Sequence, residues 1–174
     1  MENQFLVSSW LPQGRKDQWE VREDPTMPGC MQLVEWTEDS NPNLWMDDRP
    51  RELKSHLPIL NQAFGRILVT GMGLMAVQVA LARKSSVESV HTIEQNPHVV
   101  ELIWPAIQTL PAEICGKLTY EIGDADAWKP GQEERPYDFG YFDHTIFPMN
   151  EEKQSEIRDH YKICREHLFW QYTL

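Results

Sequence analysis

Residues 66–94 constrain the fold of this 174-residue chain more than any other stretch. Residues 66–70 form an apolar run of the kind that a strand buried on both faces requires. Two glycines follow within residues 71–73, and residues 74–83 are apolar at helical spacing. Residues 87–94 then alternate and end in a carboxylate. This order predicts strand, glycine turn, helix and strand, which together make one βαβ unit.

A βαβ unit with these residues has the physical features of a nucleoside-binding site. Gly71 and Gly73 allow a sharp turn and let a ligand approach the backbone without meeting a Cβ atom. The helix that follows presents free N–H groups and the positive end of its dipole. Glu94 ends the second strand, about 20 residues further on, where a carboxylate can accept both hydroxyls of a ribose. The unit therefore predicts a ligand site at the carboxyl ends of two neighbouring strands.

The charge and cysteine content limit the classes of partner and site. A formal net charge of −11, with no sizeable basic patch, disfavours nucleic acid as the main partner. The three cysteines stand far apart and form no C-x-x-C pair, so we expect reduced thiols and no metal site. We find no membrane-length apolar segment and no signal-peptide n-region in the sequence, so we expect a cytoplasmic protein without membrane contact.

We expect one compact unit with two parts: an N-terminal β appendage with a lead-in helix over residues 1–60, and a Rossmann-like domain over residues 61–174. Short apolar runs at 5–7 and 31–36, with turn signals between them, predict an antiparallel hairpin or meander. The tryptophans of this part either fill a core beneath the small sheet or line a substrate pocket.

The lead-in helix is expected to begin near residue 47, with Asp48 as its N-cap. Gly65 would end it before the first central strand. Four apolar residues at helical spacing would form its buried stripe: Leu53, Leu57, Leu60 and Phe64.

The second half of the chain continues the alternation of helices and strands. Residues 97–110 predict a helix, residues 117–122 a third strand, and residues 137–143 a fourth strand that ends in an acid. Residues 123–128 are expected to form a loop and the start of a helix. A charged amphipathic helix is expected over 150–168, carrying Cys164 in the core, before a short tail.

Four segments in this order resemble the class I S-adenosylmethionine-dependent methyltransferases: residues 67–74, 90–97, 123–130 and 137–143. The sequence is most similar to their spermidine-synthase-like branch and to small methyltransferase-like proteins of bacteriophages. The resemblance implies an α/β fold with a Rossmann-like, mostly parallel sheet in the order 3-2-1-4 and helices on both faces. The fifth to seventh strands of the full fold would be missing. The N-terminal segment, or a second subunit of a homo-oligomer, would cover the open edge.

The resemblance also implies S-adenosylmethionine as the cofactor and assigns roles to residues. Glu94 would hold the ribose hydroxyls, Asp124 would accept a hydrogen bond from the adenine amino group, and the Ala125 N–H would face the ring. Asp143 would lie beside the sulfonium, where a carboxylate can orient a nucleophile or take its proton. His144 is a second catalytic candidate. The implied cofactor-binding residues are Gly71, Met72, Gly73, Glu94, Gln95, Asp124 and Ala125.

Several of these residues have a simpler structural explanation, and two positions depart from the family pattern. Asp124 could cap a helix, and His144 could be an exposed loop histidine. Met75 stands where the family usually has a third glycine, so its side chain would either narrow the cofactor pocket or point into helix packing. Ile146 stands where aminopropyltransferases carry a second Asp, which disfavours polyamine synthesis.

The leading hypothesis is a methyltransferase that acts on a small or amine-bearing acceptor. Its methyl group would face Asp143 and the loop at 147–148. One alternative is a catalytically inactive nucleoside-binding protein, and another is a phage–host interaction protein on the same fold. An aminopropyltransferase-like or cofactor-cleaving enzyme is a further alternative.

Overall fold

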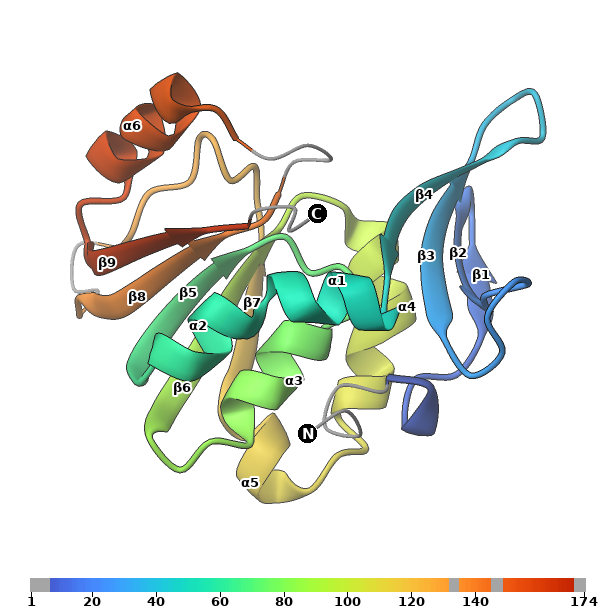
Figure 1. Cartoon of the computed structure of the whole chain (residues 1–174), viewed down its shortest axis with the longest axis horizontal. Coiled ribbons are helices and arrows are strands. Elements are labelled where there is room, and N and C mark those ends of the chain that lie inside the picture. The colour runs from blue at the N-terminus through green and yellow to red at the C-terminus, as the bar shows by residue number, and fades with distance from the viewer. Residues whose placement is uncertain (1–6, 132–134, 145–148, 171–174) are drawn as a thin grey trace.

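The computed structural model describes residues 7–131, 135–144 and 149–170, which form two β-sheets and the helices around them (Figure 1). The smaller sheet is antiparallel in the order β1-β2-β3-β4, and the larger is parallel in the order β7-β6-β5-β8-β9. The strands of the smaller sheet are β1 (Gly14–Lys16), β2 (Trp19–Glu23), β3 (Met31–Trp36) and β4 (Pro42–Asp47). The strands of the larger sheet are β5 (Gly65–Thr70), β6 (Val87–Glu94), β7 (Leu118–Ile122), β8 (Tyr137–Phe142) and β9 (Cys164–Phe169).

The helices are short, and most of them connect one strand of the parallel sheet to the next. Within the described residues, a 3₁₀ turn (Val7–Ser9) precedes β1. The α-helices are α1 (Pro50–Ser55), α2 (Leu57–Gln62), α3 (Ala76–Ala82), α4 (Pro97–Ile107), α5 (Ala112–Cys115) and α6 (Glu151–His160). Among the described residues, no helix has the length and apolar character needed to cross a membrane.

The predicted βαβ unit is confirmed as β5, α3 and β6, at the centre of the parallel sheet. Ile67, Leu68 and Val69 of β5 are each at most 1% exposed, as expected for a strand covered on both faces. Ile67 and Val69 belong to the larger core cluster, whereas Leu68 belongs to the second one. This alternation follows from the two-residue period of a strand, and it requires helices or loops on both faces of the sheet.

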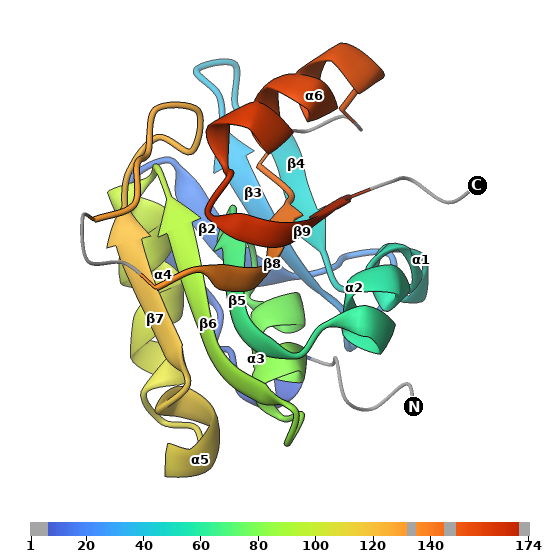
Figure 2. The same cartoon turned by 90° about the vertical axis from the view of Figure 1, so that its left-hand side faces the viewer.

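Helices α3 and α4 lie on one face of the parallel sheet, and α6 lies on the other (Figure 2). The core beneath α6 contains aromatic rings from the sheet and the adjoining loops, including Trp128, Tyr137, Phe142 and Tyr161. Both faces of the sheet are therefore buried, and the carboxyl ends of β5, β6 and β8 share one edge where a ligand site can form.

The antiparallel sheet packs beside α4 (Figure 1), where Lys16 forms a 2.8 Å ion pair with Glu101. Side chains of this sheet, such as Trp19 and Leu33, share the larger core cluster with Ile103 of α4. The sheet has four strands where the sequence predicted a hairpin or meander, and the strand expected at 31–36 is confirmed as β3. The division of the chain near residue 60 stays a prediction.

The C-terminal part differs from the predicted long helix. Helix α6 ends at His160, and β9 pairs in parallel with β8, so Cys164 lies on a strand that the sequence analysis placed in the helix. The charged α6 buries only Ile157. Without β9, the edge of β8 would have unpaired N–H and C=O groups, and the backbone of β9 pairs with them. The sheet therefore has a fifth strand where we expected the end of a helix.

The lead-in segment also differs from its prediction. Asp48 does not cap α1, because its carboxylate accepts the backbone N–H groups of Val7 at 3.2 Å and Met31 at 2.6 Å. The helix breaks at His56 into α1 and α2, and only part of the expected stripe is buried. Leu53 lies in the larger core cluster and Leu60 packs against it, but Leu57 is 41% exposed and Phe64 is 54% exposed.

Two shorter predictions need correction as well. Val7 begins a 3₁₀ turn rather than extending a strand, and residues 5 and 6 lie outside the described residues. The segment after Asp124 forms a turn in which the Asp124 carbonyl accepts the N–H groups of Ala127 and Trp128, and no α-helix follows there.

Candidate functional site

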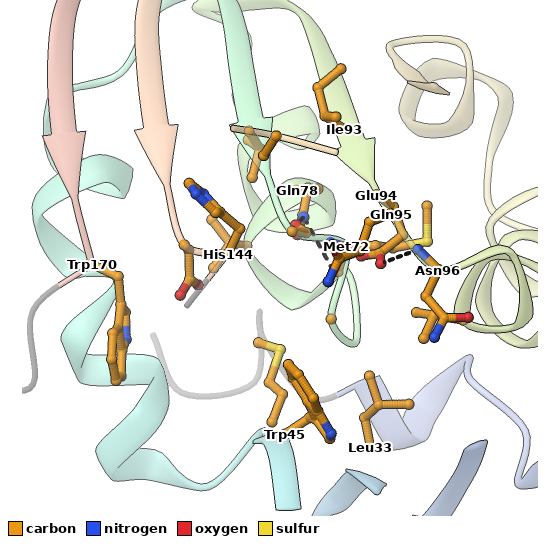
Figure 3. Close-up of a pocket in the computed structure, with 18 of the residues that line it drawn as sticks. Leu33, Trp45, Met72, Gln78, Ile93, Glu94, Gln95, Asn96, His144 and Trp170 are labelled. Carbon is orange, nitrogen blue, oxygen red and sulfur yellow. Dashed lines mark hydrogen bonds between the residues drawn. The ribbon is translucent and has the colours of Figure 1, made fainter. Parts of the chain in front are cut away.

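A cavity of about 620 Å³ lies at the carboxyl ends of β5, β6 and β8, and β3 and β4 of the antiparallel sheet close its far side (Figure 3). Every residue that the sequence analysis assigned to the site lines this cavity, although their roles remain proposals. They are Gly71, Met72, Gly73, Glu94, Gln95, Asp124, Ala125, Asp143 and His144.

The turn after β5 requires glycine at positions 71 and 73, because the backbone angles there are ones that other residues rarely adopt. Gly71 has φ +90°, and a Cβ atom there would lie 2.3 Å from the carbonyl oxygen of Asp143. Gly73 has φ +50°. The buried side chain of Gln78 on α3 donates a 3.0 Å hydrogen bond to the Gly71 carbonyl. The loop is thus held from behind by α3 and presents bare backbone to the cavity.

Glu94 provides a buried carboxylate next to this loop, with 8% of the residue exposed. Its Oε2 accepts the N–H of Met72 at 2.7 Å, and its Oε1 accepts the N–H of Asn96 at 2.8 Å (Figure 3). Burial raises the pKa of Glu94, and the backbone N–H groups of Met72, Asn96 and Gln95 oppose that rise. The carboxylate therefore ties the end of β6 to the glycine loop while it lines the cavity.

Met75, the departure from the family pattern, does not line the cavity. It is the N-cap of α3 with φ 60°, in the left-handed region, and its side chain is fully buried in the larger core cluster. A left-handed backbone favours glycine, which is a physical reason for a glycine at this position. Of the two outcomes considered from sequence, the structure shows the side chain in helix packing rather than in the pocket.

The antiparallel sheet supplies the opposite wall of the cavity. Leu33 and Trp45 lie across the cavity from Met72 and Glu94 (Figure 3). Met46 comes closer, since its sulfur accepts the N–H of Leu74 at 3.2 Å and lies where a Cβ of residue 73 would be. Two of the four tryptophans of the N-terminal part line the cavity: Trp19, which is also buried in the core, and Trp45, which is 37% exposed.

Asp124 and Ala125 lie on the turn that follows β7. Asp124 is exposed, and its Oδ1 accepts the N–H of Asp126 at 2.9 Å, so the side chain holds the turn instead of a helix. Ala125 is buried, and its carbonyl accepts the hydroxyl of Tyr161. The turn is therefore anchored to the C-terminal part of the chain.

Asp143 follows β8 directly, and 23% of its side chain is exposed. Burial raises the pKa of Asp143 to about 7, while His56 opposes the rise and Glu52 adds to it. A carboxyl group that titrates near neutral pH can both accept and release a proton, which is the property that general acid–base catalysis requires.

His144 lies beside Asp143 with both ring nitrogens near partners. Nδ1 lies 2.6 Å from Oγ1 of Thr70, and Nε2 lies 3.4 Å from Oδ1 of Asp126. Asp126 also forms a 2.9 Å ion pair with Lys153. Burial lowers the pKa of His144, and Asp126 opposes this change. These contacts give His144 a structural place in the loop after β8, in addition to its position on the cavity.

The structure adds cavity-lining residues that the sequence analysis did not assign to the site. Glu52 comes from α1 and Tyr141 from β8. Trp170 follows β9 (Figure 3), and its indole N–H donates to Oγ of Ser55 at 2.9 Å. The sequence analysis placed Glu52 on the lead-in helix, just before the Rossmann-like part. No pattern in the sequence predicts that this helix lies near β8 and residue 170.

The cavity wall is acidic. Among its described lining residues there is no Lys or Arg. The acidic side chains on it are Glu35, Asp47, Glu52, Glu94, Asp124, Asp126 and Asp143. Such a wall, with aromatic rings beside it, favours a cationic ligand over an anionic one. The described residues contain no cluster of three or more His, Cys, Asp or Glu side chains that could hold a metal ion.

No protein-family model matches this chain, and no curated protein matches its sequence. Solved methyltransferases match its fold at low sequence identity. The glycopeptide N-methyltransferase MtfA, complexed with sinefungin, matches with a TM-score of 0.54 and 13% identity, over 68% of this chain and 49% of that chain. TrmK of M. capricolum, in complex with S-adenosyl-homocysteine, matches with a TM-score of 0.53 and 8% identity, over 66% and 49%.

The methyltransferase domain of bacterial CtHen1-C gives a TM-score of 0.52 at 12% identity, over 68% of this chain and 63% of that chain. The described part of the chain therefore has the fold of the class I methyltransferases. It spans about half the length of MtfA and TrmK.

Proposed function

We propose that this chain is an S-adenosylmethionine-dependent methyltransferase whose acceptor is a small molecule that carries an amine. The observation that carries the proposal is the position of Glu94, a buried carboxylate that faces the cavity and is hydrogen-bonded to the glycine loop. A methyltransferase fold provides the context, and three solved neighbours with this fold are methyltransferases.

The residues of the cavity fit this cofactor. Glu94 would hold the ribose, and the bare backbone at Gly71 and Gly73 would lie against the methionyl part. Asp124 and Ala125 would face the adenine. A wall without Lys or Arg among its described residues suits the positive charge of a sulfonium, and a volume of about 620 Å³ is within the range of small-molecule sites.

An amine acceptor follows from the chemistry of Asp143. An alkylamine is protonated near neutral pH and has no free lone pair, so it needs a base before it can attack carbon. The Asp143 carboxylate would accept one proton from the acceptor ammonium. When bound, S-adenosylmethionine supplies an activated methyl group: as the nitrogen–carbon bond forms, the carbon–sulfur bond breaks and its electron pair stays on sulfur.

Four sequence segments, 67–74, 90–97, 123–130 and 137–143, support a finer placement in the spermidine-synthase-like branch, near small bacteriophage proteins. Aminopropyl transfer is disfavoured by Ile146, which lies outside the described residues, as does the 147–148 loop that would face the methyl group. A cytoplasmic location and a homo-oligomer remain predictions.

The first test is calorimetry with S-adenosylhomocysteine on the wild type and on Glu94→Gln. The Gln side chain removes the charge and one acceptor oxygen, and a hydrogen bond to a charged group contributes about 1.5–3 kcal/mol. We expect a loss of affinity of at least about tenfold. Glu88→Gln is the matched control, because Glu88 lies on the same strand, is exposed and does not line the cavity. Equal affinity of Glu94→Gln and wild type would overturn the site.

The second test is mass spectrometry after incubation with S-adenosylmethionine and a panel of aliphatic amines, among them 1,4-diaminobutane. Formation of S-adenosylhomocysteine and a methylated amine supports the methyltransferase. Binding heat without product indicates a nucleoside-binding protein, and methylthioadenosine released without an acceptor indicates cofactor cleavage. If S-adenosylhomocysteine gives no heat at all, an interaction protein on the same fold becomes the better explanation.

A further inference from the structure

A buried histidine lies behind the cavity wall, outside the set of residues assigned from sequence. His56, between α1 and α2, is 0% exposed and does not line the cavity, although three of its neighbours do. Its Nδ1 lies 2.6 Å from the hydroxyl of Tyr141 and 4.0 Å from Oδ2 of Asp143. Its Nε2 lies 3.4 Å from Oε1 of Glu52, one helical turn earlier. The imidazole thus lies between two carboxylates that face the cavity.

The Nε2 atom of His56 is buried and has no hydrogen-bond partner. Buried polar atoms are almost always satisfied, so an atom without a partner directly behind the cavity wall is unusual. Glu52 is close enough to attract a positive imidazole, but not in hydrogen-bonding geometry. The imidazole is therefore fixed by one short contact at Nδ1 and one charge contact at Nε2.

We propose that His56 is a positioning residue of this site: it holds the Tyr141 hydroxyl and, balanced against Glu52, controls whether Asp143 is charged when an amine arrives. This inference rests on the proposed function, in which Asp143 takes the acceptor proton. His56 cannot touch the acceptor itself, because it lies behind the wall. Its effect on the reaction would pass through Asp143 and Tyr141.

The charges around Asp143 act in opposite directions. His56 lowers the pKa of Asp143, whereas Glu52 raises it. The same burial, together with Asp143 and Glu52, raises the pKa of the Tyr141 hydroxyl well above its ordinary value. Tyr141 therefore stays protonated, and its oxygen can accept a hydrogen bond from Nδ1–H of a charged His56.

Other titratable groups near Asp143 belong to different elements. Asp47 of β4 lines the same cavity, and His144 follows Asp143 in the chain. Asp126, on the turn after β7, is ion-paired with Lys153 of α6. The His56, Glu52 and control variants proposed below leave these four residues unchanged, so their effect on the Asp143 midpoint is the same in each comparison.

The test measures the ionisation of Asp143 directly, without any ligand. We would label aspartate side-chain carboxyl carbons with ¹³C and follow their NMR shifts with pH, assigning Asp143 by its loss in Asp143→Asn. His56→Asn keeps a polar partner near the Tyr141 hydroxyl but carries no charge, and should raise the ionisation midpoint by about one pH unit. Glu52→Gln removes a negative charge and should lower the midpoint.

The direction in which the Asp143 midpoint moves in His56→Asn separates a charge effect from a packing effect. Burial is the largest cause of the raised pKa of Asp143, so any variant that loosens the wall and admits water would lower the midpoint. A fall, or no change, in His56→Asn overturns the proposal. Lys54→Gln is the matched control, because Lys54 lies on the same helix, is exposed and does not line the cavity, so water screens its charge and the midpoint should stay at the wild-type value.

The outcome can be distinguished from a failure of the proposed function. If S-adenosylhomocysteine binds but the Asp143 midpoint does not rise in His56→Asn and fall in Glu52→Gln, only the role of His56 is overturned. Absence of binding overturns the methyltransferase, and with it the role of this network in a reaction. Where methyl transfer is measured, the pH profile of kcat/KM should move up in His56→Asn and down in Glu52→Gln, in step with the NMR midpoints.

Discussion

Replacing Asp143 by Asn should make the protein more stable at high pH, because the fold forces this carboxyl group to titrate far from its ordinary range. The pKa of Asp143 is raised from 3.8 to about 7, mainly by burial at the end of β8. Asn has nearly the same shape and cannot ionise. The substitution therefore removes the titration while leaving most of the packing unchanged.

The size and sign of the effect follow from proton linkage. Between pH 3.8 and about 7 the folded chain keeps the Asp143 proton while the unfolded chain has lost it, so stability falls as pH rises through this window. Each unit of pKa corresponds to about 1.4 kcal/mol, which sets a ceiling of about 4 kcal/mol. Because 23% of the side chain is exposed, water reduces the penalty, and we expect about 2–4 kcal/mol.

Urea unfolding of the wild type and of Asp143→Asn from pH 4 to pH 9 measures this difference. The unfolding free energy of the variant minus that of the wild type should increase by about 2–4 kcal/mol between the two ends of the series, with most of the increase below pH 7.5. Carboxyl groups that do not interact with Asp143 titrate alike in both proteins and cancel. A difference that stays constant with pH would refute the claim that the fold suppresses the charge on Asp143.

Three further substitutions test the glycine loop by urea unfolding. Gly71→Ala should lower the unfolding free energy by more than about 3 kcal/mol, since the new Cβ meets the Asp143 carbonyl oxygen and the backbone φ is unfavourable for alanine. Gly73→Ala should lower it by about 1–2 kcal/mol, because the Met46 side chain can move aside. Equal losses for the two variants would contradict this explanation. Met75→Gly should still destabilise by about 2 kcal/mol, because losing a fully buried side chain outweighs about 1 kcal/mol of relieved left-handed strain, and a more stable variant would show that Met75 is not core.

Many of the residues that line the cavity could be placed together from sequence because they lie close together in the chain. Strand β5, the glycine turn and Glu94 lie within one βαβ unit, and strand and helix periods are visible in residue order. Asp143 was found in the same way, as the acid that follows an apolar strand. Parallel strands place their carboxyl ends at one edge, so these residues had to meet once the strands were recognised.

The C-terminal strand and the exposure of the lead-in helix could not be found in this way. Residues 150–168 have a charged helical pattern, but the unpaired edge of β8 makes a strand more favourable at Cys164–Phe169. Leu57 and Phe64 have the spacing of a buried stripe, yet the break at His56 directs them to solvent. Long-range pairing and packing override local pattern in both cases.

By itself, the sequence determined the central βαβ unit, the glycine loop and the acids at the strand ends, because each depends on local backbone geometry and on periodic burial. The tertiary structure alone decided that Met75 packs into the core, that the antiparallel sheet closes the cavity, and that His56 lies between Glu52 and Asp143. Those contacts join residues up to 87 positions apart, and the distance between such residues depends on how whole elements pack.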